Sequence, residues 1–105
     1  MVALALTSCA SKTAEGPQVL SGVYSTDGFE YANFVPEGSD ETWTVHGDMS
    51  NVVPKGNFPL RCGKATITVR GTVGPPGTYG HLGCCVRVLK VDQVLEVHDA
   101  KACPY

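Results

Sequence analysis

Glycine and proline interrupt this chain so often that no long helix fits between them. The 105 residues include 12 Gly and 7 Pro, which favour turns and break helices. Hydrophobic residues make up 43% of the chain, enough to fill the core of one small globular domain. The sequence therefore predicts a single all-β domain of short strands and tight turns.

The segments between the turns alternate apolar and polar residues, as β-strands do. The clearest segment is 65–73, in which Ile67 and Val69 share one face. The other expected strands are a long bent one over 19–35 with a bulge or turn at Asp27-Gly28, one over 42–46 that forms a hairpin with it, and two over 84–91 and 93–98 that are broken at Asp92. Five strands of this kind predict a small, mostly antiparallel barrel of the oligonucleotide/oligosaccharide-binding (OB) type, with at most one short helix. An open sandwich is the alternative architecture.

The alternation also predicts which side chains fill the core. We expect five side chains to be buried, because each lies on the apolar side of its strand or is the largest apolar group available: Ile67, Val69, Val88, Leu95 and Trp43.

The first residues have the character of an exported protein. An apolar run over residues 2–6 ends in Leu6-Thr7-Ser8-Cys9, and a polar stretch follows. This motif resembles the lipobox of bacterial lipoproteins, in which the cysteine carries the lipid. The resemblance implies a signal-peptide remnant over 1–8, a lipidated Cys9 with a flexible tether over 9–17, and a barrel domain over 18–105. The alternative is that the apolar run forms a first strand and Cys9 a disulfide.

The implied location is the bacterial cell envelope, where the lipid holds the domain on a membrane, facing the periplasm or the cell exterior. The charge is nearly balanced, with 8 Lys and Arg against 10 Asp and Glu. No basic surface is implied, so we expect no nucleic-acid partner. The membrane and an envelope protein or glycan are the expected partners.

Five cysteines are more than a small reduced domain usually carries, and no two have the Cys-x-x-Cys spacing of metal or redox motifs. We therefore expect the four cysteines beyond Cys9 to form disulfides. The favoured pairing is Cys62 with Cys84 and Cys85 with Cys103, because neighbouring strand residues point to opposite faces. The swapped pairing and free thiols are the alternatives, and a bond between Cys84 and Cys85 is set aside because it requires a strained ring.

The segment Thr72-Val73-Gly74-Pro75-Pro76-Gly77-Thr78-Tyr79-Gly80-His81-Leu82-Gly83, followed by a strand that includes 94–97, resembles a group of small bacterial envelope lipoproteins. Segments 28–30 and 40–43 extend the match, which is more remotely similar to the C-terminal barrel of the NlpE lipoprotein family. The resemblance implies an OB-like barrel and supplies no catalytic residues. The Cys-x-x-Cys of the NlpE family is missing here, and with it the basis for a copper-related role.

Aromatic residues gather on the first two strands, where an OB-type barrel offers its binding face. Core packing is the favoured interpretation for the aromatic rings, and a structural hydrogen bond in its glycine-rich loop is the favoured one for His81. The alternative is a ligand-binding surface made of Tyr31, Trp43, Tyr79 and His81.

Histidines at 46, 81 and 98 and the cysteines could donate to zinc or copper, but no pair has diagnostic spacing. We expect no metal, no cofactor and no enzymatic activity. The sequence favours a lipid-anchored binding or structural module for an envelope protein or glycan. The alternative is an envelope stress sensor that responds to metal or redox state through His and Cys side chains.

Overall fold

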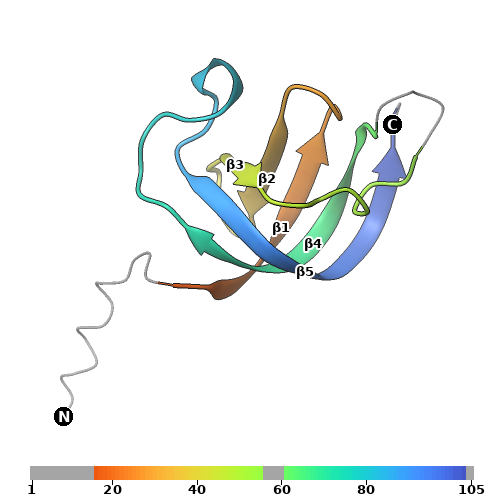
Figure 1. Ribbon diagram of the computed structural model, residues 1–105, viewed down its shortest axis with the longest axis horizontal. Helices are drawn as coiled ribbons and strands as arrows, with labels where there is room; N and C mark the ends of the chain where they lie inside the picture. The colour runs from red at the N-terminus through yellow and green to blue at the C-terminus, as the bar shows by residue number, and fades with distance from the viewer. Residues whose placement is uncertain (1–15, 56–60, 104–105) are drawn as a thin grey trace, which may run out of the picture.

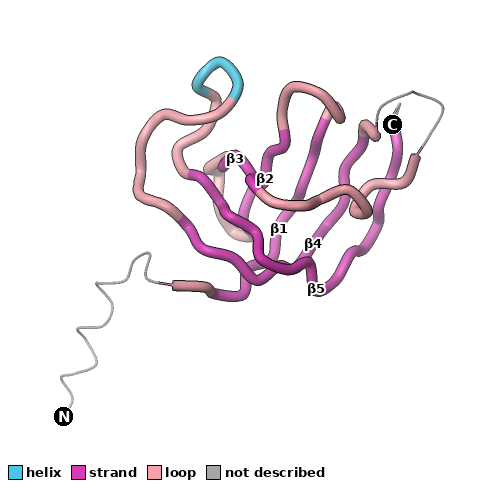
Figure 2. The backbone as a smooth tube through the Cα atoms, viewed as in Figure 1, coloured by secondary structure: helices cyan, strands magenta, loops and turns pink. Residues whose placement is uncertain are grey.

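The structure, a computed structural model, describes residues 16–55 and 61–103. Five strands wrap around one core (Figure 1), and a single short 3-10 turn lies in the loop between the last two strands (Figure 2). The elements are β1 (Gln18–Thr26), β2 (Ala32–Pro36), β3 (Trp43–His46), β4 (Gly63–Val73), the 3-10 turn η1 (His81–Gly83) and β5 (Val88–Ala102).

The strands form a closed barrel in the order β1-β2-β3-β5-β4, with β4 returning to β1. Four of the neighbouring pairs are antiparallel, and only β3 and β5 run parallel. The predicted all-β, mostly antiparallel OB-like barrel is confirmed. Closure leaves few exposed strand edges, which a small β domain must otherwise protect.

The strand boundaries differ from the sequence prediction at two places. The long first strand is two strands, because the turn at Asp27-Gly28 reverses the chain and lets β2 pair with β1. The two closing strands are one, since β5 continues through Asp92. Arg70 pairs with Gln93 and Gly71 with Val91, so Asp92 is an extra residue in a β-bulge.

A second bulge explains why one core prediction is wrong. Thr68 pairs with Glu96 and Val69 with Val94, which leaves Leu95 as the extra residue. Each bulge shifts the in-and-out alternation of β5 by one position. Leu95 is consequently 37% exposed instead of buried.

The rest of the core follows the alternation closely. Ile67 and Val69 are fully buried and Trp43 is 8% exposed, as predicted, whereas Val88 is only half-buried. Phe34 fills the centre with no exposed surface, and its ring lies against Gly22 of β1. A side chain at Gly22 would collide with this ring and with the β2 backbone, so only glycine lets the two strands approach so closely.

The disulfide pairing differs from the favoured one. Cys62 is bonded to Cys103, and Cys84 is bonded to its neighbour Cys85. The register of β4 and β5 explains the first bond, because Gly63 pairs with Ala102 and brings the flanking cysteines to a Cα separation of 5.3 Å. The second bond joins residues that lie in a loop before β5 and not in a strand, so the alternation of strand faces does not keep Cys84 and Cys85 apart.

A comparison of two truncations tests the bulged register of β5. Ile67→Ala should lower the free energy of unfolding by about 2–5 kcal/mol, because it removes a fully buried side chain from a packed core. Leu95→Ala should cost less than about 1 kcal/mol, since the bulge places Leu95 partly in solvent. Urea unfolding of both variants measures the difference, and equal losses would contradict the register.

Removing the two disulfides should have unequal effects on stability. The Cys62–Cys103 bond joins residues 41 apart, and closing a loop of that length restricts the unfolded chain by about 4 kcal/mol. The double variant C62S/C103S should lose a large part of this amount in urea unfolding. C84S/C85S should lose much less, because a bond between adjacent residues closes almost no loop. A larger loss in C84S/C85S than in C62S/C103S would contradict this pairing of the four cysteines.

Candidate functional site

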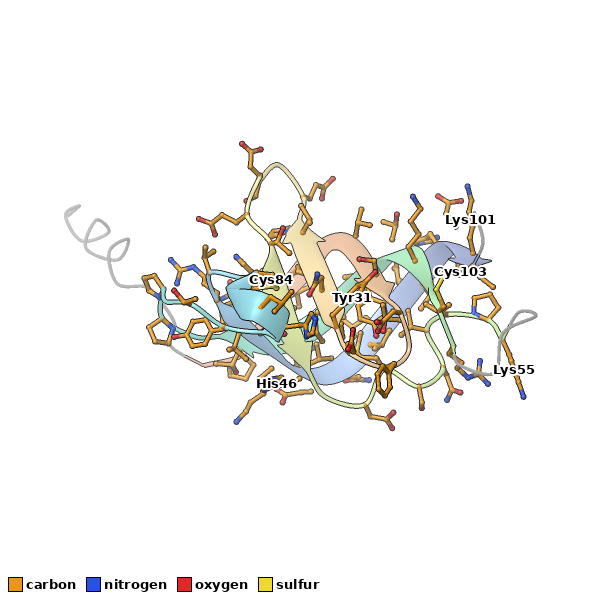
Figure 3. The ribbon with its side chains drawn as sticks, turned by 90° about the horizontal axis from the view of Figure 1, so that it is seen from above. Tyr31, His46, Lys55, Cys84, Lys101 and Cys103 are labelled. Atoms are coloured by element: carbon orange, nitrogen blue, oxygen red, sulfur yellow. A yellow bond between two sulfur atoms is a disulfide. The ribbon has the colours of Figure 1, made fainter. Side chains whose placement is uncertain are left out.

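A cleft of about 520 Å³ opens at one end of the barrel. Its walls come from the loop 27–31 between β1 and β2, from the end of β3, from the connection that follows β3, and from the start of the loop 80–84 between β4 and β5. The described lining residues are Tyr24, Thr26, Gly28, Phe29, Glu30, Tyr31, Ala32, Thr44, Val45, His46, Met49, Ser50, Val53, Arg61, Gly80 and His81. Figure 3 shows Tyr31 on this side of the domain, beside the loop that carries Cys84. We call this feature the barrel-end cleft.

The loop 27–31 is fixed by hydrogen bonds within itself. Asp27 Oδ1 accepts the backbone N–H groups of Phe29, Glu30 and Tyr31 at 2.9, 2.7 and 3.0 Å. Thr26 Oγ1 donates to the Tyr31 carbonyl at 2.6 Å. One carboxylate and one hydroxyl thus hold the whole loop in a single conformation, a common use of Asp and Thr at turns.

These hydrogen bonds also change the acidity of Asp27. Desolvation by its surroundings acts to raise the pKa of the Asp27 carboxyl. The N–H groups of Tyr31, Phe29 and Glu30 favour the ionised form and outweigh this effect, so the pKa lies below its ordinary value of 3.8. The carboxylate that holds the loop is therefore charged throughout the neutral and mildly acidic range.

The fixed loop presents an aromatic ring to solvent. Phe29 lies at the edge of the barrel-end cleft and is 76% exposed. A large apolar side chain on a loop without rigid hydrogen bonds would be free to fold back onto the surface. Here the backbone on both sides of Phe29 is held by Asp27, so the ring stays available to a partner at low entropic cost.

An ion pair connects the loops on the two sides of the cleft. His81 Nε2 lies 3.6 Å from Glu30 Oε1, and both side chains are about half exposed. The pair exists only when the imidazole is protonated, and its exposure to water keeps its contribution small. It shows that the loops 27–31 and 80–84 are within side-chain reach of each other.

The structure divides the four residues of the candidate ligand-binding surface. Tyr31 and His81 line the barrel-end cleft. Trp43 is in the core, where its ring packs near Phe34 and its Nε1 donates to Glu41 Oε1 at 2.9 Å. Tyr79 is half-buried outside the cleft, and its hydroxyl donates to the Pro75 carbonyl at 3.0 Å.

Most of the lining residues, Phe29 among them, are not part of the predicted surface, and two contributors show why. Arg61 enters from the long connection before β4, where its Nη1 donates to the Val53 carbonyl at 3.0 Å. No local pattern marks Arg61, because only the folded connection brings it to the barrel end. The sequence predicts a bulge or turn at Asp27-Gly28, and this Asp-Gly pair is the signal that could identify Asp27 as the residue that fixes the loop.

The histidines and cysteines do not converge on a metal site in the part of the chain that the structure describes. No group of three His, Cys, Asp or Glu side chains there is arranged to hold a metal ion. His46 and His81 both line the cleft, whereas His98 lies on β5 and contacts Glu96 at 3.0 Å.

The predicted lipidation site, Cys9, lies outside the described residues. Across residues 16–55 and 61–103, no helix has the length and hydropathy needed to cross a lipid bilayer.

Comparisons of this chain with protein-family models, with curated proteins and with solved structures find no match. The geometry of the barrel-end cleft is therefore the basis of the functional argument.

The acidity of Asp27 gives a testable pH dependence. A lowered pKa means that ionised Asp27 stabilises the folded loop above its ordinary value of 3.8 and that this stabilisation is lost as the pH falls through the folded-state pKa. A carboxyl-resolved NMR titration should give Asp27 a midpoint below 3.8, with the amide signals of Phe29, Glu30 and Tyr31 changing together.

The titration must distinguish individual residues because the pKa of Asp48 is also lowered, by the hydroxyl and N–H of Ser50. The amide signals of the loop should lose this pH dependence in Asp27→Asn, which keeps an acceptor oxygen but carries no charge. A midpoint for Asp27 at or above 3.8 would contradict the hydrogen bonding of the loop.

Proposed function

We propose that this protein is a non-enzymatic binding module that holds a glycan or a protein segment in the barrel-end cleft. One observation carries the proposal: Phe29 is 76% exposed on a loop whose backbone is fixed by Asp27, at the edge of a concave site. Exposed aromatic rings on rigid supports are typical anchors of binding sites. OB-type barrels also bind their ligands between the β1–β2 and β4–β5 loops.

The side chains of the cleft favour binding over hydrolysis. Glu30 is the one acidic residue among the described lining residues, and His81 of the opposite loop lies against it. Glycoside hydrolysis by the usual mechanisms needs two carboxyl groups on either side of the scissile bond. A single carboxylate beside an aromatic ring is better suited to hydrogen bonding with a sugar hydroxyl or a peptide N–H.

The charges favour a glycan or protein over a nucleic acid. Arg61 is the one permanently charged cation among the described residues of the cleft. A groove for single-stranded nucleic acid needs a track of basic side chains along the phosphates. The formal net charge of the chain is −2, which opposes such binding further.

The proposed setting is the bacterial cell envelope, with the domain held on the membrane by a lipid on Cys9. The support comes from Leu6-Thr7-Ser8-Cys9 and from the polar residues between Cys9 and the start of β1 at Gln18. More than one acyl chain on the cysteine would make the attachment stable.

A response to redox state is a second candidate function, and one specific observation favours it. Cys84 is the last residue of the loop 80–84 and is bonded to Cys85, which follows it. This disulfide lies next to the cleft, where its reduction could affect binding.

Binding experiments with two matched variants test the proposed site. Phe29→Ala should weaken binding by at least about tenfold, because removing an aromatic anchor costs more than about 1.4 kcal/mol. Val19→Ala is the control, since Val19 is 55% exposed but lies outside the cleft. Neither change should alter the free energy of unfolding by more than about 0.5 kcal/mol.

The probes are solubilised envelope polysaccharides and proteins of an envelope extract, each presented to the full-length wild type and to both variants. Retention of a component by the wild type and Val19→Ala, but not by Phe29→Ala, supports the barrel-end cleft as the binding site. Equal retention by all three would place binding elsewhere, and retention by none would count against a binding module.

A further inference from the structure

The Cys84–Cys85 disulfide occupies a tightly closed loop beside the barrel-end cleft. Tyr79 and Cys85 exchange two backbone hydrogen bonds, of 2.8 and 3.0 Å, which join the two ends of the loop. Between them, Gly83 N–H donates to the Gly80 carbonyl and Cys84 N–H to the His81 carbonyl. The loop therefore has a defined shape, and the disulfide is part of its closing end. Figure 3 shows Cys84 in this loop, far from Cys103 of the other disulfide.

The two sulfur atoms pack directly behind the wall of the cleft. A Cβ atom built on Gly80 would lie 3.0 Å from Cys84 Sγ, 3.3 Å from Cys85 Sγ and 3.2 Å from Thr44 Cβ. Gly80 and Thr44 both line the cleft, so the disulfide lies close to its wall. Cys85 is buried, so a movement of its sulfur atom inside the packed interior should displace its neighbours, which include Gly80.

The loop also holds one residue in an unfavourable backbone conformation. Leu82 has a φ of 57°, in the left-handed region that non-glycine residues rarely adopt, and its side chain is 91% exposed. No buried contact of Leu82 compensates for this conformation. Such a residue persists only where the surrounding structure constrains it, and here the constraint comes from the Tyr79–Cys85 closure and the disulfide.

Stability does not explain the presence of this disulfide. The Cys62–Cys103 bond closes a segment of 41 residues and restrains the unfolded chain, whereas the Cys84–Cys85 bond has a sequence separation of 1. Its effect is confined to the local conformation of the loop. A local constraint placed against a binding cleft suggests a role in controlling that cleft.

We infer that Cys84–Cys85 is a site of thiol–disulfide exchange with a dithiol protein, and that its oxidation state sets the shape of the barrel-end cleft. The exchange itself does not depend on the proposed binding function. Its consequence for ligand binding rests on that function.

The exposure of the two cysteines fixes the order of the exchange. Cys84 is exposed, whereas Cys85 is 1% exposed. One thiolate of the partner attacks Cys84 Sγ, the Cys84–Cys85 bond breaks, and Cys85 leaves as a thiolate that takes up a proton. The second thiolate of the partner then attacks the mixed disulfide and releases Cys84. The pair gains two electrons and two protons, and the partner dithiol becomes a disulfide.

The reduced pair has an acceptor in place. Asn33 Oδ1 of β2 lies 3.8 Å from Cys84 Sγ and 3.6 Å from Cys85 Sγ, within reach of a thiol donor. Two sulfur atoms that are no longer bonded must separate to van der Waals distance. Because Cys85 is buried and lies close to Gly80, the separation should displace the cleft wall and loosen the loop that contains His81 and Leu82.

The first experiment tests the exchange with no ligand. The oxidised full-length protein is equilibrated with increasing dithiothreitol under native conditions, denatured in iodoacetamide and digested with trypsin. Both Cys84 and Cys85 fall in the peptide 71–87, separate from Cys62 and Cys103. Alkylation of this peptide should appear at a dithiothreitol concentration about tenfold lower than alkylation of the other two cysteines. Reduction of both disulfides at the same dithiothreitol concentration, or of Cys62–Cys103 first, would overturn the assignment of Cys84–Cys85 as the site of exchange.

The second experiment tests the effect on the cleft by comparing amide NMR spectra of the oxidised protein, the selectively reduced protein and C84S/C85S. Reduction and substitution should both shift the amide signals of Gly80, His81 and Thr44. The control C62S/C103S perturbs the ends of β4 and β5 and should leave these three signals in place. If only residues 84 and 85 shift, the inference that the oxidation state sets the shape of the cleft is overturned. Neither experiment uses a ligand, so their outcomes are independent of whether the binding proposal fails.

Discussion

The parallel pairing of β3 with β5 is the contact on which the rest of this structure depends. It joins only residues 44–46 to residues 88–90, yet without it the sheet would be an open strip with two exposed edges. Parallel neighbours cannot be linked by a tight hairpin. After β3 the chain instead crosses the barrel through residues 47–55, as Figure 1 shows, and β4 begins at Gly63. Val52 and Val53 of this connection are buried and complete the core.

Most of the fold could be predicted from alternation and turn chemistry, and the errors have a common cause. In β4 every second residue is buried without interruption, so Ile67 and Val69 were placed correctly. In β5 the extra residues Asp92 and Leu95 shift the alternation, and no property of either residue reveals this in the sequence. Bulges are determined by the pairing of two strands around a curved barrel, so they depend on a partner strand that is distant in the chain.

The candidate site was predicted less well, because its residues come from loops. Tyr31 and His81 were identified as aromatic and polar residues near the expected binding face, and both line the cleft. Trp43 lies in the core beside Phe34, as its predicted burial requires, and is not among the lining residues of the cleft. Alternation gives no information for the loop 80–84, so it could not predict the bond between Cys84 and Cys85.

The two loops of the cleft are fixed by different chemistry, and this difference determines which of them can change. Asp27 holds the loop 27–31 with a charged group that stays ionised at every physiological pH, so that side of the cleft is constant. The loop 80–84 is closed by backbone hydrogen bonds and by a covalent bond that a reductant can open. The exposed pair of His81 and Glu30 links the two loops only weakly. A change of oxidation state would therefore move one wall of the cleft against a fixed one, which alters the fit of a ligand without unfolding the domain that presents it.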